Sequence, residues 1–376
     1  MKNKYDDIAE NKSIDECRIE IDKIDETIVN LLNDRLLYGK QIGKQKFEKG
    51  NQILDTGREK AILERLQSIN KGPLAENVLH YIYSVIITAT KEIQKPLMIS
   101  YLGPEATYSH IAAMNYFGHS GTFVPKFNIK DIFLDVERGN SNFGVVPVEN
   151  SIEGAVNPTL DQLFETDLKI SSEKYQPISH ALLSKTGDIS DVNIVYSHPQ
   201  PCGQCRNWLS TNLPGVQIEE CSSTARAAQK ASENSKIAAI ASTKAAQMYN
   251  LKVIKPQIAD YSKNVTRFLI LSKEAITKKT GNDKTSIMFV TAHNPGALFN
   301  ALEPVAKAGL NIVKLESRPT KRQNWNYFFI MDIEGHIEDK NLQDALEKMK
   351  EFCLFHKNLG SYPNLEHKIE EIEKID

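Results

Sequence analysis

The sequence lacks the features that mark membrane and secreted proteins. No stretch approaches the roughly 18 consecutive apolar residues that a membrane-spanning helix needs. The polar N-terminal segment has no apolar core of the kind found in signal peptides. The five cysteines are odd in number and scattered, unlike a secreted disulfide framework, and they fit a reducing compartment. We therefore expect a cytoplasmic protein with no membrane partner.

Signals for metals, nucleotides and nucleic acids are also scarce. No glycine-rich phosphate loop or dinucleotide-binding fingerprint follows a strand pattern, and no cluster has the spacing of metal ligands. Cys202 and Cys205 would need a second ligand pair to hold zinc, or a thioredoxin-like context for redox chemistry, and neither is visible. The net charge of −2 gives no reason to expect nucleic acid as a partner. We expect no cofactor, no metal and no nucleic acid.

What the sequence does contain divides into three parts. Its 376 residues suffice for two or three domains, and 41% hydrophobic with 25% charged content is ordinary for globular domains. Residues 1–95 show helical periodicity, and residues 97–275 alternate short apolar runs with helical patterns. Residues 284–376 follow the order strand, helix, strand, strand, helix, strand. We predict a multidomain chain with an all-α module, an α/β domain and a smaller α+β domain.

The N-terminal part carries a helical seam that a charge interrupts. Apolar residues recur three and four positions apart from Ile14 to Leu31, and the continued seam lands on Arg35. A buried charge without a partner is costly, so either an anionic ligand or an internal ion pair must compensate Arg35. Arg18 and Arg35 are about 26 Å apart along one helix, so both can bind one small ligand only if they come from different chains. The pattern thus predicts an intertwined dimer.

Polar clusters interrupt the apolar runs of the middle part. Two of them directly follow predicted strands, and in α/β domains ligands bind beyond the carboxyl ends of strands. In a third cluster, Thr266 and Arg267 place a hydroxyl and a cation in an apolar strand, for which the plain alternative is an edge strand with a solvated arginine. The clusters, which together predict a ligand-binding cleft, lie at 147–151, 197–200, 222–225 and 264–267.

The order of these motifs resembles a known enzyme family. Segments 101–109, 146–151, 197–200 with Gln204-Cys205, and 264–268 are similar to the motifs of prephenate dehydratases. The flanking parts resemble the helical module and the ACT regulatory domain of bifunctional chorismate mutase–prephenate dehydratases. The resemblance implies a chorismate mutase module at 1–95 and a dehydratase domain at 97–275, with two α/β lobes of periplasmic-binding-protein type. It also implies a βαββαβ ACT domain at 284–376.

For the mutase module, the resemblance assigns site residues position by position. Chorismate to prephenate is a pericyclic rearrangement, so the site has to hold a dicarboxylate in a compact conformer and stabilise charge on the ether oxygen. Lys46 and Gln94 are expected at the ether oxygen, and Glu59 at the substrate hydroxyl. The other predicted substrate-binding residues of the mutase are Arg18, Arg35, Asp55, Arg58 and Thr90.

For the dehydratase domain, the resemblance gives Thr266 the catalytic role. Prephenate loses its ring hydroxyl together with carbon dioxide, and the departing hydroxyl needs a proton donor. A threonine hydroxyl is a weak acid, so Thr266 must be assisted by neighbours that the sequence does not reveal. The predicted substrate-binding residues are Asn150, Ser151, Ser197, Gln204 and Arg267.

Four further positions of the dehydratase pattern carry weaker expectations. Ala106 stands where the family often has glycine; a positive φ would strain alanine, and we expect the loop to tolerate it. Glu149 either assists catalysis or caps a helix. His180 and His198 match family histidines and are expected to be structural.

The C-terminal part matches two motifs of the phenylalanine site in dehydratase ACT domains. The predicted allosteric residues are Gly296, Ala297, Leu298, Glu316, Ser317, Arg318 and Pro319. The alternative is an ACT-like domain that only mediates pairing. The resemblance implies a homodimer or tetramer that acts on chorismate and prephenate, forms phenylpyruvate and is inhibited by phenylalanine. Two alternatives stay open: arogenate as the dehydratase substrate, and an amino-acid-sensing protein without turnover.

Overall fold

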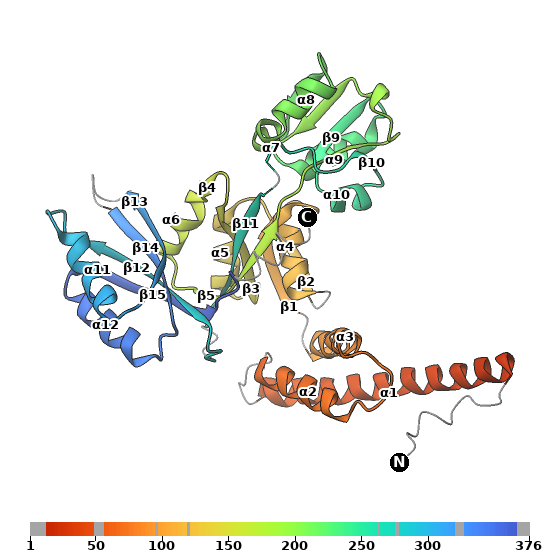
Figure 1. Cartoon of the computed structure of the whole chain (residues 1–376), viewed down its shortest axis with the longest axis horizontal. Helices are drawn as coiled ribbons and strands as arrows, with labels where there is room; N and C mark the ends of the chain where they lie inside the picture. The colour runs from red at the N-terminus through yellow and green to blue at the C-terminus, as the bar shows by residue number, and fades with distance from the viewer. Residues whose placement is uncertain are drawn as a thin grey trace. The chain divides into compact units, whose positions relative to one another are not determined.

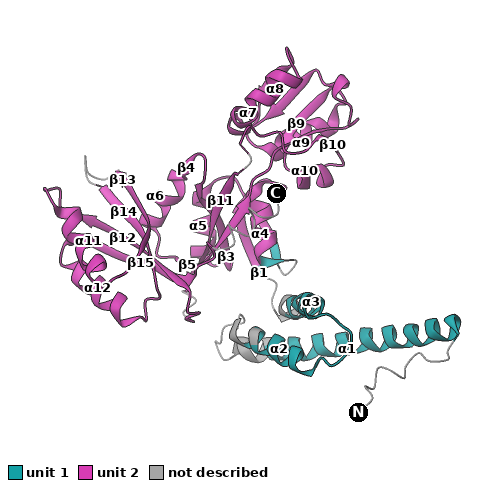
Figure 2. Ribbon diagram, viewed as in Figure 1, with its two compact units in different colours: residues 1–97, 117–122 teal, residues 98–116, 123–376 magenta. Residues whose placement is uncertain are grey.

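The computed structural model describes residues 13–48, 56–94, 97–118, 121–261, 263–274, 278–319 and 327–366. The chain divides into two compact units, coloured separately in Figure 2. The first is Met1–Leu97 with Phe117–Thr122, and the second is Met98–Tyr116 with Phe123–Asp376. None of the described helices is both long and apolar enough to cross a membrane.

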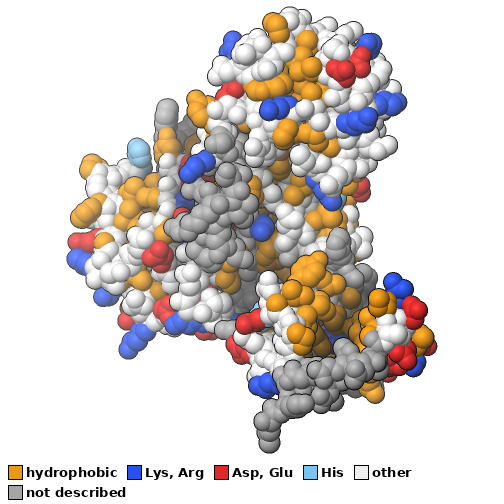
Figure 3. Space-filling model, turned by 45° about the vertical axis from the view of Figure 1, so that its right-hand side comes forward, with side chains coloured by type: hydrophobic (Ala, Val, Ile, Leu, Met, Phe, Trp, Pro, Cys, Tyr) orange, Lys and Arg blue, Asp and Glu red, His pale blue; other side chains and the backbone are white. Residues whose placement is uncertain are grey.

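Helices make up the first unit, as predicted for the N-terminal module. They are α1 (Ile14–Glu48), α2 (Thr56–Ile69) and α3 (Glu76–Gln94), shown in Figure 1. A capping box starts α1, because Ser13 Oγ accepts from the backbone N–H of Glu16 while the Glu16 carboxylate accepts from that of Ser13. The predicted apolar seam lies on α1, and within one chain Ile14 and Leu31 are exposed on it. Hydrophobic side chains are visible on the surface of these helices (Figure 3).

The first lobe of the middle domain is built on a sheet with strand order β2-β1-β3-β11-β5, with β4 paired to β3. The strands are β1 (Leu97–Leu102), β2 (Gly121–Lys126), β3 (Phe143–Asn150), β4 (Gly154–Ala155), β5 (Lys169–Pro177) and β11 (Val265–Ser272). The helices are α4 (Tyr108–Phe117), α5 (Ile129–Arg138) and α6 (Asn157–Glu165). Strand β11 lies between β3 and β5 and is antiparallel to both.

The pairing of β11 with β3 extends further than the sequence predicts. The polar cluster at 147–151 was expected to follow a strand, but β3 continues through it to Asn150. The register shifts by one residue between Arg267 and Phe268, so that Phe268 pairs with Pro147 and Arg267 with Glu149. The bulge lets the ladder pass the proline, which cannot donate a backbone hydrogen bond. As a result, Thr266 lies opposite Asn150.

The second lobe has a sheet of its own with strand order β10-β6-β9-β7-β8. The strands are β6 (Ala181–Ser184), β7 (Ile194–Ser197), β8 (Gln217–Glu220), β9 (Ile237–Ala241) and β10 (Lys252–Lys255). The helical elements are η1 (Ile189–Asp191), α7 (Pro199–Gln204), α8 (Arg206–Asn212), α9 (Thr224–Glu233) and α10 (Thr243–Met248). The predicted α/β domain with two lobes is therefore confirmed.

The C-terminal domain has the predicted βαββαβ order and a sheet arranged β13-β14-β12-β15. The elements are β12 (Asp283–Thr291), α11 (Ala297–Lys307), β13 (Ile312–Pro319), β14 (Tyr327–Glu334), α12 (Lys340–Lys350) and β15 (Cys353–Pro363). The last strand, faint in the sequence, is eleven residues long. The pairing of β15 with β12 makes these residues a full strand, although their own sequence has only a weak strand pattern.

Both faces of the C-terminal sheet are covered, which explains why β12 is buried along nearly its whole length. Ile287 and Phe289 pack on the domain's own helices, whereas Met288 and Val290 join the core of the first lobe. Strand β15 reaches β5 of that lobe at Gly360, where a Cβ would collide with the backbone carbonyl of Ile170. Only glycine permits this close approach of the two strands. The C-terminal domain and the first lobe share one hydrophobic core, to which Met288 and Val290 belong.

Candidate active sites and regulatory motifs

The two faces of β11 carry different chemistry, and Thr266 defines the first. Successive residues of a strand point to opposite faces, so the side chains of Thr266 and Arg267 diverge. Asn150 Nδ2 donates to Thr266 Oγ1 at 2.8 Å, and both side chains are buried. Because Thr266 Oγ1 accepts this hydrogen bond, its own proton is available to another acceptor.

A chain of amides surrounds Asn150 and Thr266. Asn150 Nδ2 also donates to Asn264 Oδ1 at 2.6 Å, and Asn264 Nδ2 donates to Gln204 Oε1 at 3.1 Å. Gln204 Nε2 in turn donates to Glu153 Oε1 at 3.2 Å. Gln204 ends α7 in the second lobe, whereas the other residues lie on or beside β3 and β11 of the first. The structure thus brings the predicted residues Asn150, Gln204 and Thr266 into one site that joins both lobes.

Two histidines flank this site in different ways. His180 Nε2 lies 3.0 Å from Gln204 Oε1, and burial lowers the pKa of His180 although this hydrogen bond opposes the shift. His198 caps the start of α7, where its Nδ1 accepts from the backbone N–H of Gln200. The cap fits the structural role expected of His198, while His180 is in direct contact with the amide chain.

The two predicted serines occupy different places. Ser151 Oγ accepts from the backbone N–H of Val265 at 3.0 Å, and Ser151 lines a cavity together with Glu149 and Arg267. Ser197 is fully buried, and its hydroxyl donates to the carbonyl of Ile240 at 2.9 Å in the core of the second lobe. In this structure the Ser197 hydroxyl bonds within the lobe, where β7 packs against β9, and its role in binding substrate stays a prediction.

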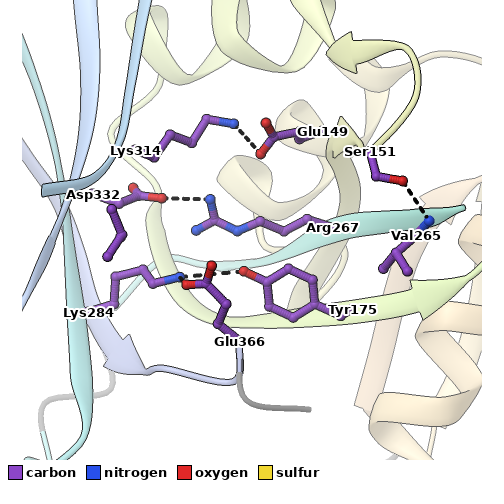
Figure 4. A pocket seen from close by; sticks show the side chains of 10 residues that line it. Glu149, Ser151, Tyr175, Val265, Arg267, Lys284, Lys314, Asp332 and Glu366 are labelled. Atoms are coloured by element: carbon purple, nitrogen blue, oxygen red, sulfur yellow. Dashed lines mark hydrogen bonds and ion pairs between the residues drawn. The ribbon is translucent and has the colours of Figure 1, made fainter. Parts of the chain in front are cut away.

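Arg267 faces away from Thr266 and enters a buried ionic cluster. Its Nε donates to Glu173 at 2.8 Å, its Nη1 to Asp332 at 2.6 Å and its Nη2 to the Tyr362 hydroxyl at 3.0 Å. Lys284 completes the cluster, with Nζ 3.3 Å from Glu173. Arg267 was predicted to bind the dehydratase substrate; the structure instead commits its guanidinium to the C-terminal domain, because strand alternation turns it to that face (Figure 4).

Mutual compensation of charge keeps this buried cluster ionised. Burial opposes the charge of Arg267, yet Asp332 and the other neighbours raise the pKa of Arg267 well above its ordinary value. Burial likewise acts to raise the pKa of Asp332, but Arg267 and a hydrogen bond from Ser286 outweigh it and lower that pKa. Removing Arg267 would leave Asp332 buried without its ion-pair partner, whereas removing Asp332 would leave Arg267 with Glu173 as its carboxylate partner.

A cavity of about 270 Å³ lies beside this cluster, between the first lobe and the C-terminal domain. Glu149 on β3 points into it and meets Lys314 Nζ on β13 at 2.5 Å (Figure 4). Glu149 was expected to assist catalysis or to cap a helix; the structure instead shows an ion pair with the C-terminal domain. Glu149 is adjacent to Asn150 in sequence, but the pleat of β3 turns the two side chains to opposite faces.

The C-terminal motifs lie at the edge of their sheet. Gly296 adopts φ 82° and caps α11, a left-handed conformation that favours glycine. Ala297 and Leu298 open that helix, and Glu316, Ser317, Arg318 and Pro319 end β13, an edge strand. Arg318 Nη2 lies 3.3 Å from Asp161 on α6, so the second motif also touches the first lobe.

In the N-terminal module, α1 and α3 bring Arg35 and Thr90 together. Arg35 Nη1 donates to the Thr90 hydroxyl and, at 3.4 Å, to the carbonyl of Ile86. Among the residues that the structure describes, these two acceptors of Arg35 are both neutral. Arg18 is exposed and pairs with Asp15 at 3.4 Å.

The remaining predicted mutase residues are only partly described. Arg58 and Glu59 lie in the first turn of α2. Lys46 and Gln94 belong to α1 and α3, but their side chains lie outside the described part, and Asp55 lies outside the described residues altogether.

Ala106 does adopt the conformation that favours glycine. Its φ is 65°, and its backbone N–H donates to His110 Nδ1 at 3.1 Å. His110 stacks on Tyr101, with ring centroids 4.7 Å apart. The loop therefore accommodates alanine at a positive φ. The hydrogen bond to His110 holds Ala106 in this conformation, which strains its backbone.

Comparisons with known proteins identify the family to which the chain belongs. Family models match in order: chorismate mutase type II at residues 17–95, prephenate dehydratase at 99–276 and the ACT domain at 285–351. A bifunctional chorismate mutase/prephenate dehydratase from Aquifex aeolicus is 44% identical over 94% of this chain and 98% of its own length. The chain belongs to the family of bifunctional chorismate mutase/prephenate dehydratases.

Other members and solved structures agree with this placement. The bifunctional enzyme of Escherichia coli K12 is 34% identical over 92% of this chain and 95% of its own length. The prephenate dehydratase of Arthrobacter aurescens, solved in complex with L-Phe, aligns with a TM-score of 0.67 and 32% identity over 72% of this chain and 91% of that one. The middle domain is thus a prephenate dehydratase domain, and the C-terminal domain is an ACT domain.

Sequence reasoning missed several polar residues of this bifunctional enzyme. Asn264 and Glu153 belong to the amide chain, and Glu173 and Asp332 to the ionic cluster. Asn264 directly precedes the strand with Thr266, and its place two residues before Thr266 was a usable signal. For the ionic residues no local signal existed, since their partners lie at least 65 positions away.

Proposed function

We propose that this chain converts chorismate to prephenate in residues 1–95 and prephenate to phenylpyruvate in residues 97–275, under feedback by phenylalanine through residues 284–376. The observation that carries the dehydratase assignment is the hydrogen bond from Asn150 Nδ2 to Thr266 Oγ1. It leaves the Thr266 proton for a substrate oxygen and places a donor where negative charge would develop.

In the dehydratase reaction, two bonds of prephenate break together. The bond between the ring and its carboxylate breaks, carbon dioxide leaves, and the electron pair makes the ring aromatic. The C–OH bond breaks at the same time, and the departing hydroxide takes the Thr266 proton to leave as water. Asn150 stabilises charge on Thr266 Oγ1 until solvent returns a proton, so each turnover consumes one proton. The proposed substrate-binding residues are Asn150, Ser151, Ser197 and Gln204.

For the mutase, we propose that Arg35 and Thr90 bind the substrate together. The neutral acceptors of Arg35 leave its positive charge for a carboxylate. Lys46 and Gln94 would act on the ether oxygen and Glu59 on the hydroxyl, with Arg18, Asp55 and Arg58 as further contacts. The exposed apolar seam of α1 supports a homodimer in which Arg18 reaches the partner's site.

Phenylalanine is proposed to bind the two ACT motifs at Gly296–Leu298 and Glu316–Pro319. We infer a cytoplasmic location because all five cysteines are free. The Arthrobacter relative, solved with L-Phe, supports the ligand. Lys314 and Arg318 on the same strand contact Glu149 and Asp161, which supports an effect on the dehydratase more than on the mutase.

An assay with chorismate as the only substrate tests the proposal. Chorismate loss and phenylpyruvate formation are followed separately, with and without phenylalanine. We expect phenylpyruvate to accumulate and phenylalanine to reduce its formation more than it reduces chorismate loss. Chorismate loss that stops at prephenate would contradict the dehydratase assignment and direct the test to arogenate. No turnover of either substrate, with phenylalanine still bound, would indicate a sensing protein.

A further inference from the structure

The amide chain beside Thr266 closes into a ring of hydrogen bonds. Asn150 Oδ1 accepts from the backbone N–H groups of Ile152 and Glu153, at 3.0 and 3.1 Å. From Asn150 the ring runs through Asn264 and Gln204 to the carboxylate of Glu153. Glu153 thus closes the ring with two groups: its backbone N–H donates to Asn150, and its carboxylate accepts from Gln204.

The direction of every hydrogen bond in this ring follows from chemistry. A backbone N–H can only donate, so the Asn150 atom that faces it is oxygen, and Nδ2 faces Asn264 and Thr266. An amide NH₂ also only donates, so Asn264 presents Oδ1 to Asn150 and Nδ2 to Gln204. Gln204 must then turn Nε2 to Glu153, whose carboxylate can only accept. Every hydrogen bond in the ring therefore joins one donor to one acceptor.

His180 reinforces the same direction. Gln204 Oε1 accepts from Asn264, so the His180 Nε2 that lies 3.0 Å from it is also a donor. The imidazole is then the neutral tautomer with its proton on Nε2, in keeping with the lowered pKa of this buried histidine. The hydrogen bond between Gln204 and His180 therefore fixes both the orientation of the Gln204 amide and the tautomer of His180.

We propose that Asn264 and Glu153 are positioning residues of the dehydratase, which hold the Asn150 amide so that Thr266 Oγ1 accepts from it and directs its own proton to the substrate. The inference rests on the proposed role of Thr266 as donor. If the Asn150 amide were reversed, its oxygen would take the Thr266 proton and the donor would be lost. Because Gln204 comes from the second lobe, the ring is complete only when the lobes meet in this arrangement.

Exchange of donor and acceptor between Gln204 and Glu153 tests the ring. Gln204→Glu sets two carboxylates about 3.2 Å apart, and we expect dehydratase kcat to fall roughly 10- to 100-fold at pH 7 with a smaller change in KM. In the double variant Glu153→Gln/Gln204→Glu, the new amide at 153 donates to the new carboxylate at 204, which still accepts from Asn264. Most of the lost kcat should return.

The pH profile separates positioning from a purely structural effect. In Gln204→Glu the two facing carboxylates share one proton as the pH falls, and the protonated one can donate to the other. Relative to the parent, the dehydratase kcat of this variant should therefore rise between pH 7 and pH 5. A purely structural defect would give no such recovery.

Two further variants complete the design. Gln217→Glu is the matched control, since Gln217 Nε2 donates to Glu219 at 2.7 Å in an exposed pair on β8 of the same lobe, and it should leave dehydratase kcat unchanged. Asn264→Asp still accepts from Asn150 but cannot donate to Gln204, so kcat should fall as it does in Gln204→Glu. Because the mutase module belongs to the other compact unit, circular dichroism and thermal unfolding of the whole chain are used to report that each variant is folded.

The outcomes distinguish this inference from the function on which it rests. Thr266→Val with full dehydratase activity would contradict the proposed role of Thr266 as proton donor, on which the inference rests. If Thr266→Val is inactive but Gln204→Glu and Asn264→Asp match the parent, the ring does not position Asn150 and the inference falls. A double variant no better than Gln204→Glu alone would overturn it as well.

Discussion

Strand β11 presents two neighbouring residues to two unlike environments. Thr266 pairs with Asn150, and their side chains meet other uncharged amides between the lobes. Arg267 pairs with Glu149, and their side chains meet the charges of the ACT domain. On the face of Thr266 and Asn150, called the neutral face, uncharged hydroxyl and amide groups set the directions of the hydrogen bonds, and the carboxylate of Glu153 enters the ring only at Gln204. The charged face binds two domains together through strong, mutually dependent partners.

One strand thus carries both faces. Because neighbouring residues of β11 and β3 point to opposite faces, a shift of either strand would move residues of both faces. The neutral face depends on the direction of its hydrogen bonds, and the charged face depends on the balance of its charges. Variants on each face should therefore fail in different ways.

Removal of the Thr266 hydroxyl should have the largest effect. Thr266→Val keeps the shape of the side chain but has no proton to donate, so dehydratase kcat should fall about 100-fold or more. Mutase activity in the same chain should not change. Thr266→Ser, which keeps the hydroxyl, is the matched variant and should retain much more activity than Thr266→Val. Equal rates for the two variants would show that the hydroxyl is not the donor.

Arg267→Met should damage stability rather than chemistry first. It leaves Asp332 buried without its ion-pair partner and Glu173 with Lys284 alone, and we expect a loss of about 3–5 kcal/mol in the free energy of unfolding. Chemical denaturation measures this. Lys236→Met, which breaks the exposed pair with Asp191, is the control and should cost less than about 1 kcal/mol. A similar small loss for Arg267→Met would mean that the ionic cluster carries little stability.

Acid should affect the charged face selectively. The pKa of Asp332 is lowered in the folded protein: burial would raise it, but Arg267 and Ser286 dominate. The unfolded state therefore binds more protons, so the contribution of Asp332 is fully present above the unfolded value of about 4 and is lost as the pH falls below it. Asp332→Asn should be less stable at pH 7 and should show a shallower decline in stability under acid. An unchanged acid decline would assign it to other groups.

Lys314→Met tests whether the charged face conveys the regulatory signal. It breaks the pair with Glu149 beside Asn150, so roughly five-fold more phenylalanine should be needed to inhibit the dehydratase by half. The control is Lys307→Met, which removes an exposed pair with Glu303 in the same domain and should leave inhibition as it is. The same phenylalanine response in both variants would exclude this pair from the signal.

Ala106→Gly lies outside both faces and should have the smallest effect. Its φ of 65° strains alanine, and glycine relieves that strain at some cost in chain entropy, so stability should rise by up to about 1 kcal/mol. Dehydratase kcat serves as the companion measurement and should stay within about two-fold. A clear loss of stability would show that the methyl group contributes more through packing than it costs in strain.

Much of the fold could be read from local pattern. The seam of α1, the alternation of strands and helices in the middle and the βαββαβ order at the end are periodic signals. Thr266 and Asn150 stood out as polar residues in apolar surroundings, whereas Gln204 was assigned by the family resemblance. Arg267 shows the limit of such reasoning. A polar residue in an apolar run reveals that it needs a partner, but its sequence does not say whether the partner is a ligand or another side chain.

By itself, the sequence determined the helices and strands, the three-part division and the residue types of the site, because those depend on neighbours a few positions away. Only the tertiary structure decided which face of β11 each side chain takes. The bulge at Arg267–Phe268 and the insertion of β11 between β3 and β5 set that register, and a shift by one residue would exchange the two faces. Asn264, Glu153 and the ionic partners of Arg267 acquire their roles from that register alone.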